Sequence, residues 1–598
     1  MQSEIFVSYA RQDEMEVLAV VDAIRSHGYK VWIDQEGIQG AKLWSQEIVH
    51  AIEECKIFIL FASANSFDSK NVAKELALAS ESEKQILPIF IDESSVPAEM
   101  KYQLAGIQHL VHNLSQPQRT IEAILKTLDS AKVQSSEEKV PTKAESKPAP
   151  APAGAGFGSK MFLAFFAALV LVGAFFLFKG EEKNKPNNPS KAASEKKFKS
   201  TIDLCVVTVR DSTADGTVST ENRQLRSSLF DKLTLFRDYK IILGEPISPD
   251  ADSTVLKQLA AKMDAEYVIQ VSIENEGQKV NTRLVAGGNG QVFWTRSMVP
   301  EDFDSNGSFV DAVTSRIAGN VVGYAGIIHR EVLRGALVKK EEDLTPMELL
   351  QIGKSIWELE EKDNTRRARE YLEKCIKLNP DIATAHAVLM DVYLEDIRKQ
   401  YNEVSNAHEK AKAAQARSVE LDPKNAIGLI GDMWMAWHDK NMVKAKVAID
   451  RALDANPHDP FITASAGAFY ARTGEDPELG KKYVEQAIGN SETPQSWYYH
   501  ALVHYHLGKG ELDKALENQL KHGTAHYHSK LWAISIYWLN NEEKQAVELV
   551  KEIKRNRPDF DLSEFQRLMN TYQTDLKTFD LLSKAMMDAL AGYDHGLK

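Results

Sequence analysis

The sequence has few cysteines, and none of them lies at a spacing that binds metal or forms a local disulfide. Its 598 residues include 3 cysteines, Cys55, Cys205 and Cys375, which are far apart and form no CxxC motif. The pattern therefore predicts neither a disulfide framework nor a zinc site. The first residues also lack a basic stretch followed by an apolar one, so we expect no cleavable export signal there.

Clusters of basic residues are scarce as well. The chain has 72 Lys and Arg against 85 Asp and Glu, which gives a formal net charge of -13. Binding to nucleic acid requires clustered cations that neutralise phosphates, so DNA or RNA is not expected as a partner. At this length, 43% hydrophobic and 26% charged residues predict several folded domains.

Long apolar runs are absent except for one. Residues 161–178 read MFLAFFAALVLVGAFFLF between Lys160 and Lys179. This run predicts a single transmembrane helix, because a buried amphipathic helix would show polar residues with a period of about 3.6. Lysines are more frequent after the run, which favours a cytoplasmic C-terminal side, but large domains cross membranes largely regardless of loop charge. We expect a single-pass protein of the cell membrane, with the N-terminal domain in the cytoplasm and the C-terminal part in the periplasm.

Polar segments flank this run on both sides. Residues 129–160 are rich in Pro, Ala, Ser and Lys, and residues 179–200 are polar and charged. Neither segment has enough large apolar side chains to offset the entropy of ordering, so we expect both to be linkers.

Residues 1–128 alternate between strand and helix patterns. Short β-rich runs read EIFVSYA, YKVWID, IFILFAS and ILPIFID, and segments with helical spacing of apolar residues separate them. This alternation predicts a parallel sheet with helices on both faces. In such folds, ligands bind at the carboxyl ends of the strands.

The same motifs resemble a known family over residues 4–114. The segments are IFVSYARQD, VWIDQEGIQGAKLWSQEIVHAI, KIFILFASANSFDSKNVAKELALA and ILPIFID. In order and spacing they resemble the bacterial form of the Toll/interleukin receptor (TIR) domain. The resemblance implies a flavodoxin-like α/β fold and association with other TIR domains.

The resemblance also implies a reaction, because many TIR domains cleave NAD at the nicotinamide glycosidic bond. The family's catalytic glutamate lies in the motif S-x-W-x-x-x-E, which reads SKNVAKE here and ends at Glu75. A fixed carboxylate can stabilise the oxocarbenium-like ribose that forms when nicotinamide leaves. NAD would be the substrate, and no cofactor or metal is expected. Asn71 replaces the motif's aromatic residue, which removes a stacking surface one helical turn before Glu75.

Other residues would lie around the nucleotide by the same resemblance. Each also has a simpler explanation: a glutamate near a helix start can serve the helix dipole, Trp44 can be a core aromatic, and Arg11 can be a solvated surface charge. The expected binding residues are Ser8, Tyr9 and Arg11 after the first strand, Asp34, Gly40, Lys42 and Trp44 in and after the next loop, and Asn71.

Residues 201–335 show a second alternation of strands and helices. Two period-2 runs on either side of ENEGQK predict a hairpin, and GGNGQ predicts the turn to the next strand. The order of AEYVIQVSI and GQVFWT resembles the TolB-like segment of bacterial signalling proteins. We expect an α/β domain without a catalytic motif.

Residues 345–560 contain a repeat. A small residue is followed twelve positions later by proline at Ala368, Ala411, Ala445 and Ala546, and Gly480 and Ala515 take the small position between them. The steps are near 34 residues, as in tetratricopeptide helix pairs, and predict a helical solenoid with a concave binding face. Residues 561–598 are expected to form a helical cap.

A group of histidines lies within these repeats. No HExxH motif or acidic partner accompanies them, so packed or solvated positions are favoured over metal binding. The group consists of His500, His504, His506, His522, His526 and His528.

Two functions follow from these patterns. In the first, the TIR domain hydrolyses NAD under the control of a C-terminal sensor module. In the second, the TIR domain is a non-catalytic adaptor that binds other TIR domains, while the repeats bind a protein or peptide. The replacement of the motif aromatic by Asn71 favours the second.

Overall fold

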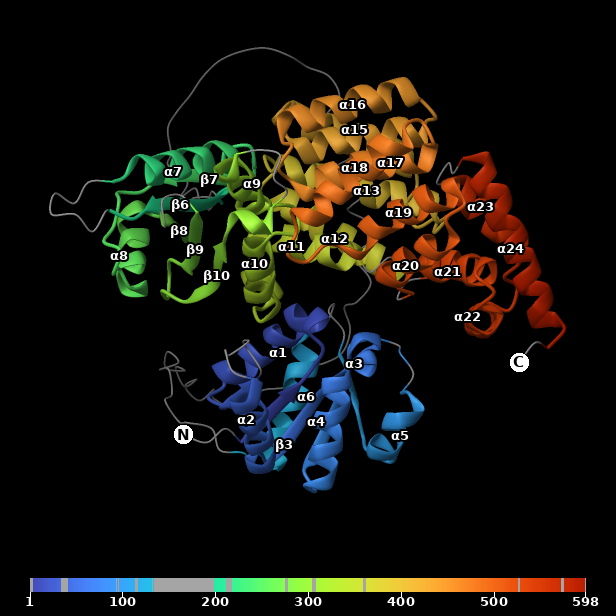
Figure 1. Ribbon diagram of the computed structural model, residues 1–598, viewed down its shortest axis with the longest axis horizontal. Helices are drawn as coiled ribbons and strands as arrows, with labels where there is room; N and C mark the ends of the chain where they lie inside the picture. Colours follow the sequence, from blue (N-terminus) through green and yellow to red (C-terminus); the bar gives the residue numbers. More distant parts are fainter. Residues whose placement is uncertain are drawn as a thin grey trace, which may run out of the picture. The chain divides into compact units, whose positions relative to one another are not determined.

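The structure is a computed structural model of the chain (Figure 1). It describes residues 4–33, 41–92, 94, 96–112, 117–131, 133, 198–210, 218–274, 278–303, 308–358, 362–524, 527–571 and 575–596.

The N-terminal domain is built on a five-stranded sheet with the strand order β2-β1-β3-β4-β5. All neighbouring strands run parallel, which confirms the predicted parallel sheet and gives the flavodoxin-like order. The strands are β1 (Ile5–Ser8), β2 (Val31–Ile33), β3 (Ile57–Ala62), β4 (Gln85–Phe90) and β5 (Leu110–Val111).

Helices cover both faces of this sheet, because successive strand residues point to opposite sides. In β3, Ile57 and Ile59 join a core with α1 and α6, whereas Phe58 and Leu60 join a core with α2, α4 and α5. The helices are α1 (Glu14–Ser26), α2 (Ala41–Glu54), α3 (Ala64–Asp68), α4 (Lys70–Glu81), α5 (Ala98–Leu104) and α6 (Pro117–Ser130), with the 3-10 turn η1 (Arg11–Asp13).

A second sheet follows in the chain, with the order β10-β9-β8-β6-β7. It is mixed: β6 runs parallel to β7 and β8, whereas β8, β9 and β10 pair antiparallel, as the predicted hairpins require. The elements are β6 (Ile202–Thr208), α7 (Thr220–Leu233), β7 (Tyr239–Leu243), α8 (Ser253–Met263), β8 (Tyr267–Glu274), β9 (Lys279–Ala286), β10 (Val292–Met298), η2 (Pro300–Asp302) and α9 (Phe309–Val322).

The remaining chain is helical and folds mainly as consecutive antiparallel pairs (Figure 1). After α10 (Ile327–Leu337) and η3 (Glu341–Asp343), the pairs are α11 (Pro346–Trp357) with α12 (Lys362–Leu378), α13 (Ala383–Arg398) with α14 (Ala407–Leu421), α15 (Ala426–His438) with α16 (Met442–Ala455), α17 (Pro460–Thr473) with α18 (Pro477–Gly489), α19 (Ser496–Lys509) with α20 (Leu512–His522), and α21 (Tyr527–Leu539) with α22 (Glu543–Asn556). The chain then continues with α23 (Leu562–Thr571) and α24 (Leu576–Asp594).

The predicted repeat matches this pairing, because every small residue lies on the second helix of a pair. Ala368, Ala411 and Ala445 are fully buried. At Gly480 the approach is closer still, since an added Cβ would lie 2.6 Å from the backbone nitrogen of Ala471 on α17. Small side chains therefore set the spacing within the pairs.

Local signals in the sequence begin several of these helices. The Asp459 side chain accepts a hydrogen bond from the backbone N–H of Phe461, and Asp476 accepts one from Leu479, at 2.9 and 3.0 Å. In each case proline occupies the first turn, where its missing N–H costs nothing. The Asp-Pro dipeptides thus set the starts of α17 and α18.

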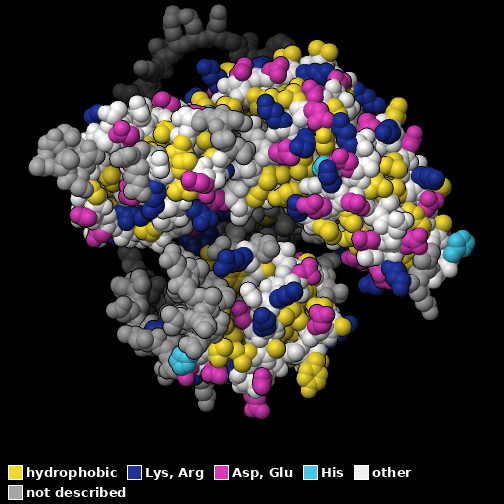
Figure 2. Space-filling view, in the orientation of Figure 1, with side chains coloured by type: hydrophobic (Ala, Val, Ile, Leu, Met, Phe, Trp, Pro, Cys, Tyr) yellow, Lys and Arg dark blue, Asp and Glu magenta, His cyan; other side chains and the backbone are white. Residues whose placement is uncertain are grey.

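The second sheet and the first helix pairs share one hydrophobic core. This core extends from Ile202 on β6 through Val313 on α9 to Phe469 on α17. A smaller core, which includes Trp532 and Phe565, holds the last helices together. Basic and acidic side chains are interspersed over the visible face of the helical region (Figure 2).

One part of the predicted fold class is wrong. In the described ranges, no helix combines the length and the apolar character needed to cross a membrane. The longest described helix, α24, carries the charged residues Lys577, Asp580 and Lys584. The predicted span at 161–178 and the predicted linkers around it lie outside the described residues, apart from the first few and last few linker positions.

Candidate active site at the edge of the N-terminal sheet

The candidate site lies at the carboxyl edge of the parallel sheet. There β1 ends at Ser8 and β3 ends at Ala62, and Ser8 is aligned with Leu60 across the two strands. After β1 the chain continues to α1 on one face of the sheet, whereas after β3 it continues through α3 to α4 on the other face. In open α/β sheets, ligands bind at the point where neighbouring strands connect to opposite faces in this way.

Glu75 reaches this edge from α4. The Ser8 hydroxyl donates a hydrogen bond to Glu75 Oε2 at 2.6 Å. Ser8 is buried, whereas Glu75 is partly exposed. The helix is oriented by Val72, Leu76 and Ala79, which are buried against the sheet. A short, charge-assisted bond of this kind holds the carboxylate in one position at the end of β1.

The position of Glu75 within its helix argues against a simple dipole role. The helix starts at Lys70, after Ser69, whose side chain accepts a hydrogen bond from the N–H of Val72. No acidic residue lies in the first turn. Because the dipole effect fades beyond that turn, it does not account for Glu75.

The structure brings together only part of the predicted residue set. Asn71 is exposed on α4, one turn before Glu75. Tyr9 is half-buried and packs against the core of α1 and α6, which is on the opposite sheet face from α4. Arg11 is exposed in η1.

The remaining predicted residues belong to the connection after β2. Asp34 and Gly40 lie outside the described residues. Lys42 and Trp44 fall in the first turns of α2, and their side chains lie outside the described part of the chain. Ser8 and Glu75 are one pair of the predicted set that the structure joins directly.

A second polar network at the same edge is absent from the sequence predictions. Asp13 accepts hydrogen bonds from the Ser63 hydroxyl at 2.5 Å and from the Asn65 side-chain amide at 2.7 Å. Nearby, the N–H of Ala64 donates to Asp92 Oδ2 at 2.8 Å. Burial raises the pKa of Asp13, and the bonds from Ser63 and Asn65 oppose this shift.

This network joins the connections that follow three neighbouring strands, β1, β3 and β4. It therefore fixes the loops around the Ser8–Glu75 pair. The polar residues just after each strand were the sequence signal that could have predicted this network. One such segment, SANS at residues 63–66 after β3, also forms the capping box of α3.

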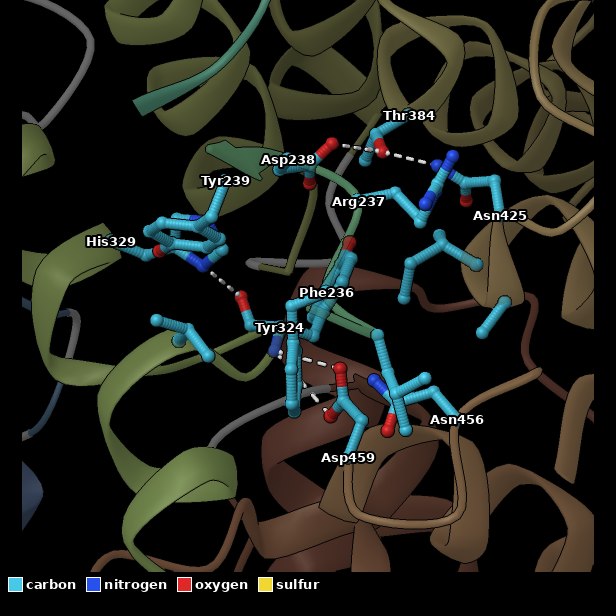
Figure 3. A pocket seen from close by; sticks show the side chains of 14 residues that line it. Phe236, Arg237, Asp238, Tyr239, Tyr324, His329, Thr384, Asn425, Asn456 and Asp459 are labelled. Atoms are coloured by element: carbon cyan, nitrogen blue, oxygen red, sulfur yellow. Dashed lines mark hydrogen bonds between the residues drawn. The ribbon is translucent and has the colours of Figure 1, made fainter. Parts of the chain in front are cut away.

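A different polar cluster lies where the second sheet meets the helix pairs (Figure 3). We call it the junction cluster. It consists of Asp238, Tyr324, His329 and Asp459, which Figure 3 labels, and of Lys354, which bonds to Tyr324 but is not drawn there. The Lys354 ammonium donates to the carbonyl of Tyr324 at 2.7 Å, and the N–H of Tyr324 donates to Asp459 Oδ2 at 3.1 Å. His329 Nδ1 donates to the carbonyl of Gly323 at 2.8 Å.

Burial shifts the ionisation of this cluster. It raises the pKa of Asp459 to about 6 and lowers that of Lys354 to about 8. The adjoining cavity has a volume of only about 30 Å³, which holds one or two water molecules but no larger ligand. The junction cluster is therefore a structural connection between the second sheet and the repeats.

The predicted histidine group is packed among aromatic rings. The centroids of His500 and His504 are 4.9 Å apart, and both rings contact Trp532, at 4.6 and 4.5 Å. His522 stacks on His500 at 4.9 Å. Burial lowers the pKa of His500 and His504 well below the ordinary value. His500 and His504 are therefore neutral packing residues. The expectation that no acidic residue accompanies the group is wrong for His506, because its Nδ1 lies 2.6 Å from Glu511 Oε2. His526 lies outside the described residues.

Comparison with known proteins identifies the N-terminal region. Residues 5–125 match the family model described as TIR domain, which confirms the resemblance. No curated protein matches the chain. The comparisons give no support to the TolB-like resemblance expected for residues 201–335.

One solved structure with similarity to the chain is that of PilW, a widely conserved type IV pilus biogenesis factor. The match has 17% sequence identity and covers 39% of this chain and 99% of that chain, with a TM-score of 0.27. A score this low supports no inference about the fold or function of the chain.

Proposed function

We propose that the TIR domain at residues 5–125 is a signalling enzyme that hydrolyses NAD, and that Glu75 is its catalytic residue. The observation that supports this most is the 2.6 Å hydrogen bond from Ser8 to Glu75 at the carboxyl edge of the sheet. There the carboxylate is fixed beside the place where this fold class binds ligands.

The chemistry requires little of the protein beyond this carboxylate. The glycosidic bond from the ribose to nicotinamide breaks, and its electron pair leaves with the neutral nicotinamide. Positive charge then develops on the ribose, where an adjacent carboxylate stabilises it. Water adds to the anomeric carbon and loses a proton, which gives ADP-ribose.

The C-terminal helix pairs supply the regulatory part of the proposal. Stacked helical repeats form extended surfaces that bind proteins or peptides, and TIR domains commonly associate with one another. A ligand bound by the repeats would bring TIR domains together and switch on the reaction.

A second candidate function is a non-catalytic TIR adaptor. Asn71 favours it, because the family motif has an aromatic residue there that could stack on a base or on nicotinamide. In the adaptor, the same TIR surfaces bind other TIR domains, and no nucleotide is consumed.

The exposed position of Asn71 on α4 gives a test that separates these functions. Asn71→Trp restores the motif aromatic without entering the core, so we expect it to raise nicotinamide release from NAD by about tenfold through base stacking. Asn71→Leu is the matched control, since it adds apolar area without an aromatic ring. If neither the native chain nor Asn71→Trp releases nicotinamide, the adaptor function is supported and the enzyme is excluded.

Ser8 is expected to act as a positioning residue for Glu75. A hydrogen bond to a charged group contributes about 1.5–3 kcal/mol, so Ser8→Ala is expected to lower kcat roughly tenfold to a hundredfold. Ser8→Thr keeps the hydroxyl and should recover most of the rate. Equal kcat values for native and Ser8→Ala chains would show that the bond does not support the reaction.

A further inference from the structure

Two histidines and an aspartate meet at the surface between consecutive helix pairs. His408 is the second residue of α14, His438 is the last residue of α15, and Asp439 follows it directly. The possible ligand atoms of these three residues all lie within 4.8 Å of one another. We propose that His408, His438 and Asp439 bind a divalent transition-metal ion of the zinc class.

The distances fit such an ion. His408 Nε2 lies 3.1 Å from Asp439 Oδ1. Zinc bonds of about 2.0–2.1 Å at tetrahedral angles place neighbouring ligand atoms about 3.3 Å apart, so these atoms are already at the required separation. The ring centroids of His408 and His438 are 5.7 Å apart, and the ligand atom of His438 lies within 4.8 Å of the other two. Binding would therefore require a side-chain rotation that brings the imidazole nitrogen of His438 closer to them.

The donor types select the metal. Two imidazoles and one carboxylate suit Zn²⁺, Ni²⁺ or Cu²⁺, whereas Mg²⁺ and Ca²⁺ require sets of oxygen ligands. The side chains of His408 and Asp439 are 35% and 41% exposed. Water can therefore reach the ion and complete its coordination.

The surrounding charges include one that helps and one that opposes. Glu409 Oε1 lies 4.0 Å from His408 Nδ1, which is too far for a hydrogen bond but close enough for its negative charge to favour a bound cation. The positive charge of Arg398, on α13, acts on His438 and opposes cation binding there. Arg398 also forms an ion pair with Glu395 at 3.6 Å.

The positions of the ligands give the ion a structural effect. His408 belongs to the pair α13/α14, whereas His438 and Asp439 are at the end of the first helix of the pair α15/α16. An ion bound by all three would therefore cross-link consecutive repeats and stiffen the surface that they form.

Zinc binding to the full-length chain tests the proposal. Zn²⁺ binding is measured by competition with a chromophoric chelator. The native chain is expected to have one more Zn²⁺ site than His408→Gln or His438→Gln, or to bind Zn²⁺ at that site at least about tenfold more tightly than either variant. His595→Gln, which changes an exposed histidine near the C-terminus, should bind as the native chain does. Bound Co²⁺ should give visible absorption bands that weaken in Asp439→Asn.

The variants change surface residues, and circular dichroism will show that each is folded. The same number of sites and the same affinity in the native chain and in both histidine variants would overturn the proposal. Absence of any zinc binding to the native chain would overturn it as well.

Discussion

Replacing Glu75 by glutamine is expected to reduce nicotinamide release from NAD at least about a hundredfold, because removing one preorganised electrostatic group commonly costs that much. Glutamine has nearly the same shape and still accepts the hydrogen bond from Ser8. It cannot stabilise positive charge on the ribose, however, because it is neutral. The loss should appear in kcat more than in KM, since the charge develops only in the transition state. Release is measured by chromatography of nicotinamide.

A matched control lies on the same helix. Glu81 is the exposed last residue of α4, and Glu81→Gln changes the charge of the chain equally without altering the Ser8 contact. It is expected to keep the native rate. Retention of the native rate by Glu75→Gln would remove Glu75 from the mechanism.

Replacing Lys354 by methionine is expected to destabilise the C-terminal module by about 3–5 kcal/mol, since removing one partner of a buried ionic group leaves the others uncompensated. Lys354 is 4% exposed, and its ammonium lies 3.8 Å from the centre of the Tyr324 ring. The ammonium lowers the pKa values of Asp238 and Asp459, against the larger opposing effect of burial. Methionine fills a similar volume but provides neither the charge nor the bond to Tyr324.

Urea unfolding, followed by circular dichroism, measures this loss. Lys340→Met is the matched control, because Lys340 is exposed and should tolerate the change with little effect. An unchanged urea midpoint for Lys354→Met would show that the junction cluster does not hold the second sheet to the repeats.

The same lysine gives a pH signature with a defined sign. Burial lowers its pKa from 10.5 to about 8, so between these pH values the unfolded chain binds more protons than the folded chain. Stability from this group therefore rises as pH increases from about 8 to about 10.5, and Lys354→Met should remove that rise. For Asp459, burial raises the pKa from 3.8 to about 6, so its contribution is present at low pH and is lost as pH rises through that range.

The patterned parts of the fold were predictable from the sequence. Alternating runs such as IFILFAS give strands whose residues enter two different cores, as Ile57 and Phe58 do. The small residues of the repeats lie where two helices approach, because only short side chains fit there. The predicted fold class was wrong in its membrane helix. That prediction depended on a single apolar run, and none of the described helices is long and apolar enough to cross a membrane.

The candidate site was predictable only in part. Glu75 and Ser8 were predicted from a family resemblance, but their hydrogen bond is visible only in the folded structure. Asp13 and Ser63 were missed because their partnership depends on loops from separate strands. Asp238, Lys354 and Asp459 come from distant parts of the sequence, where each is an ordinary polar residue, and only folding makes them a cluster.

The most direct test of the central claim is the release of nicotinamide by the purified native chain incubated with NAD, at concentrations high enough for TIR domains to associate. We predict nicotinamide and an ADP-ribose product that accumulate together, in proportion to the amount of protein. A folded chain that releases no nicotinamide above the buffer background, at any concentration, would contradict the account.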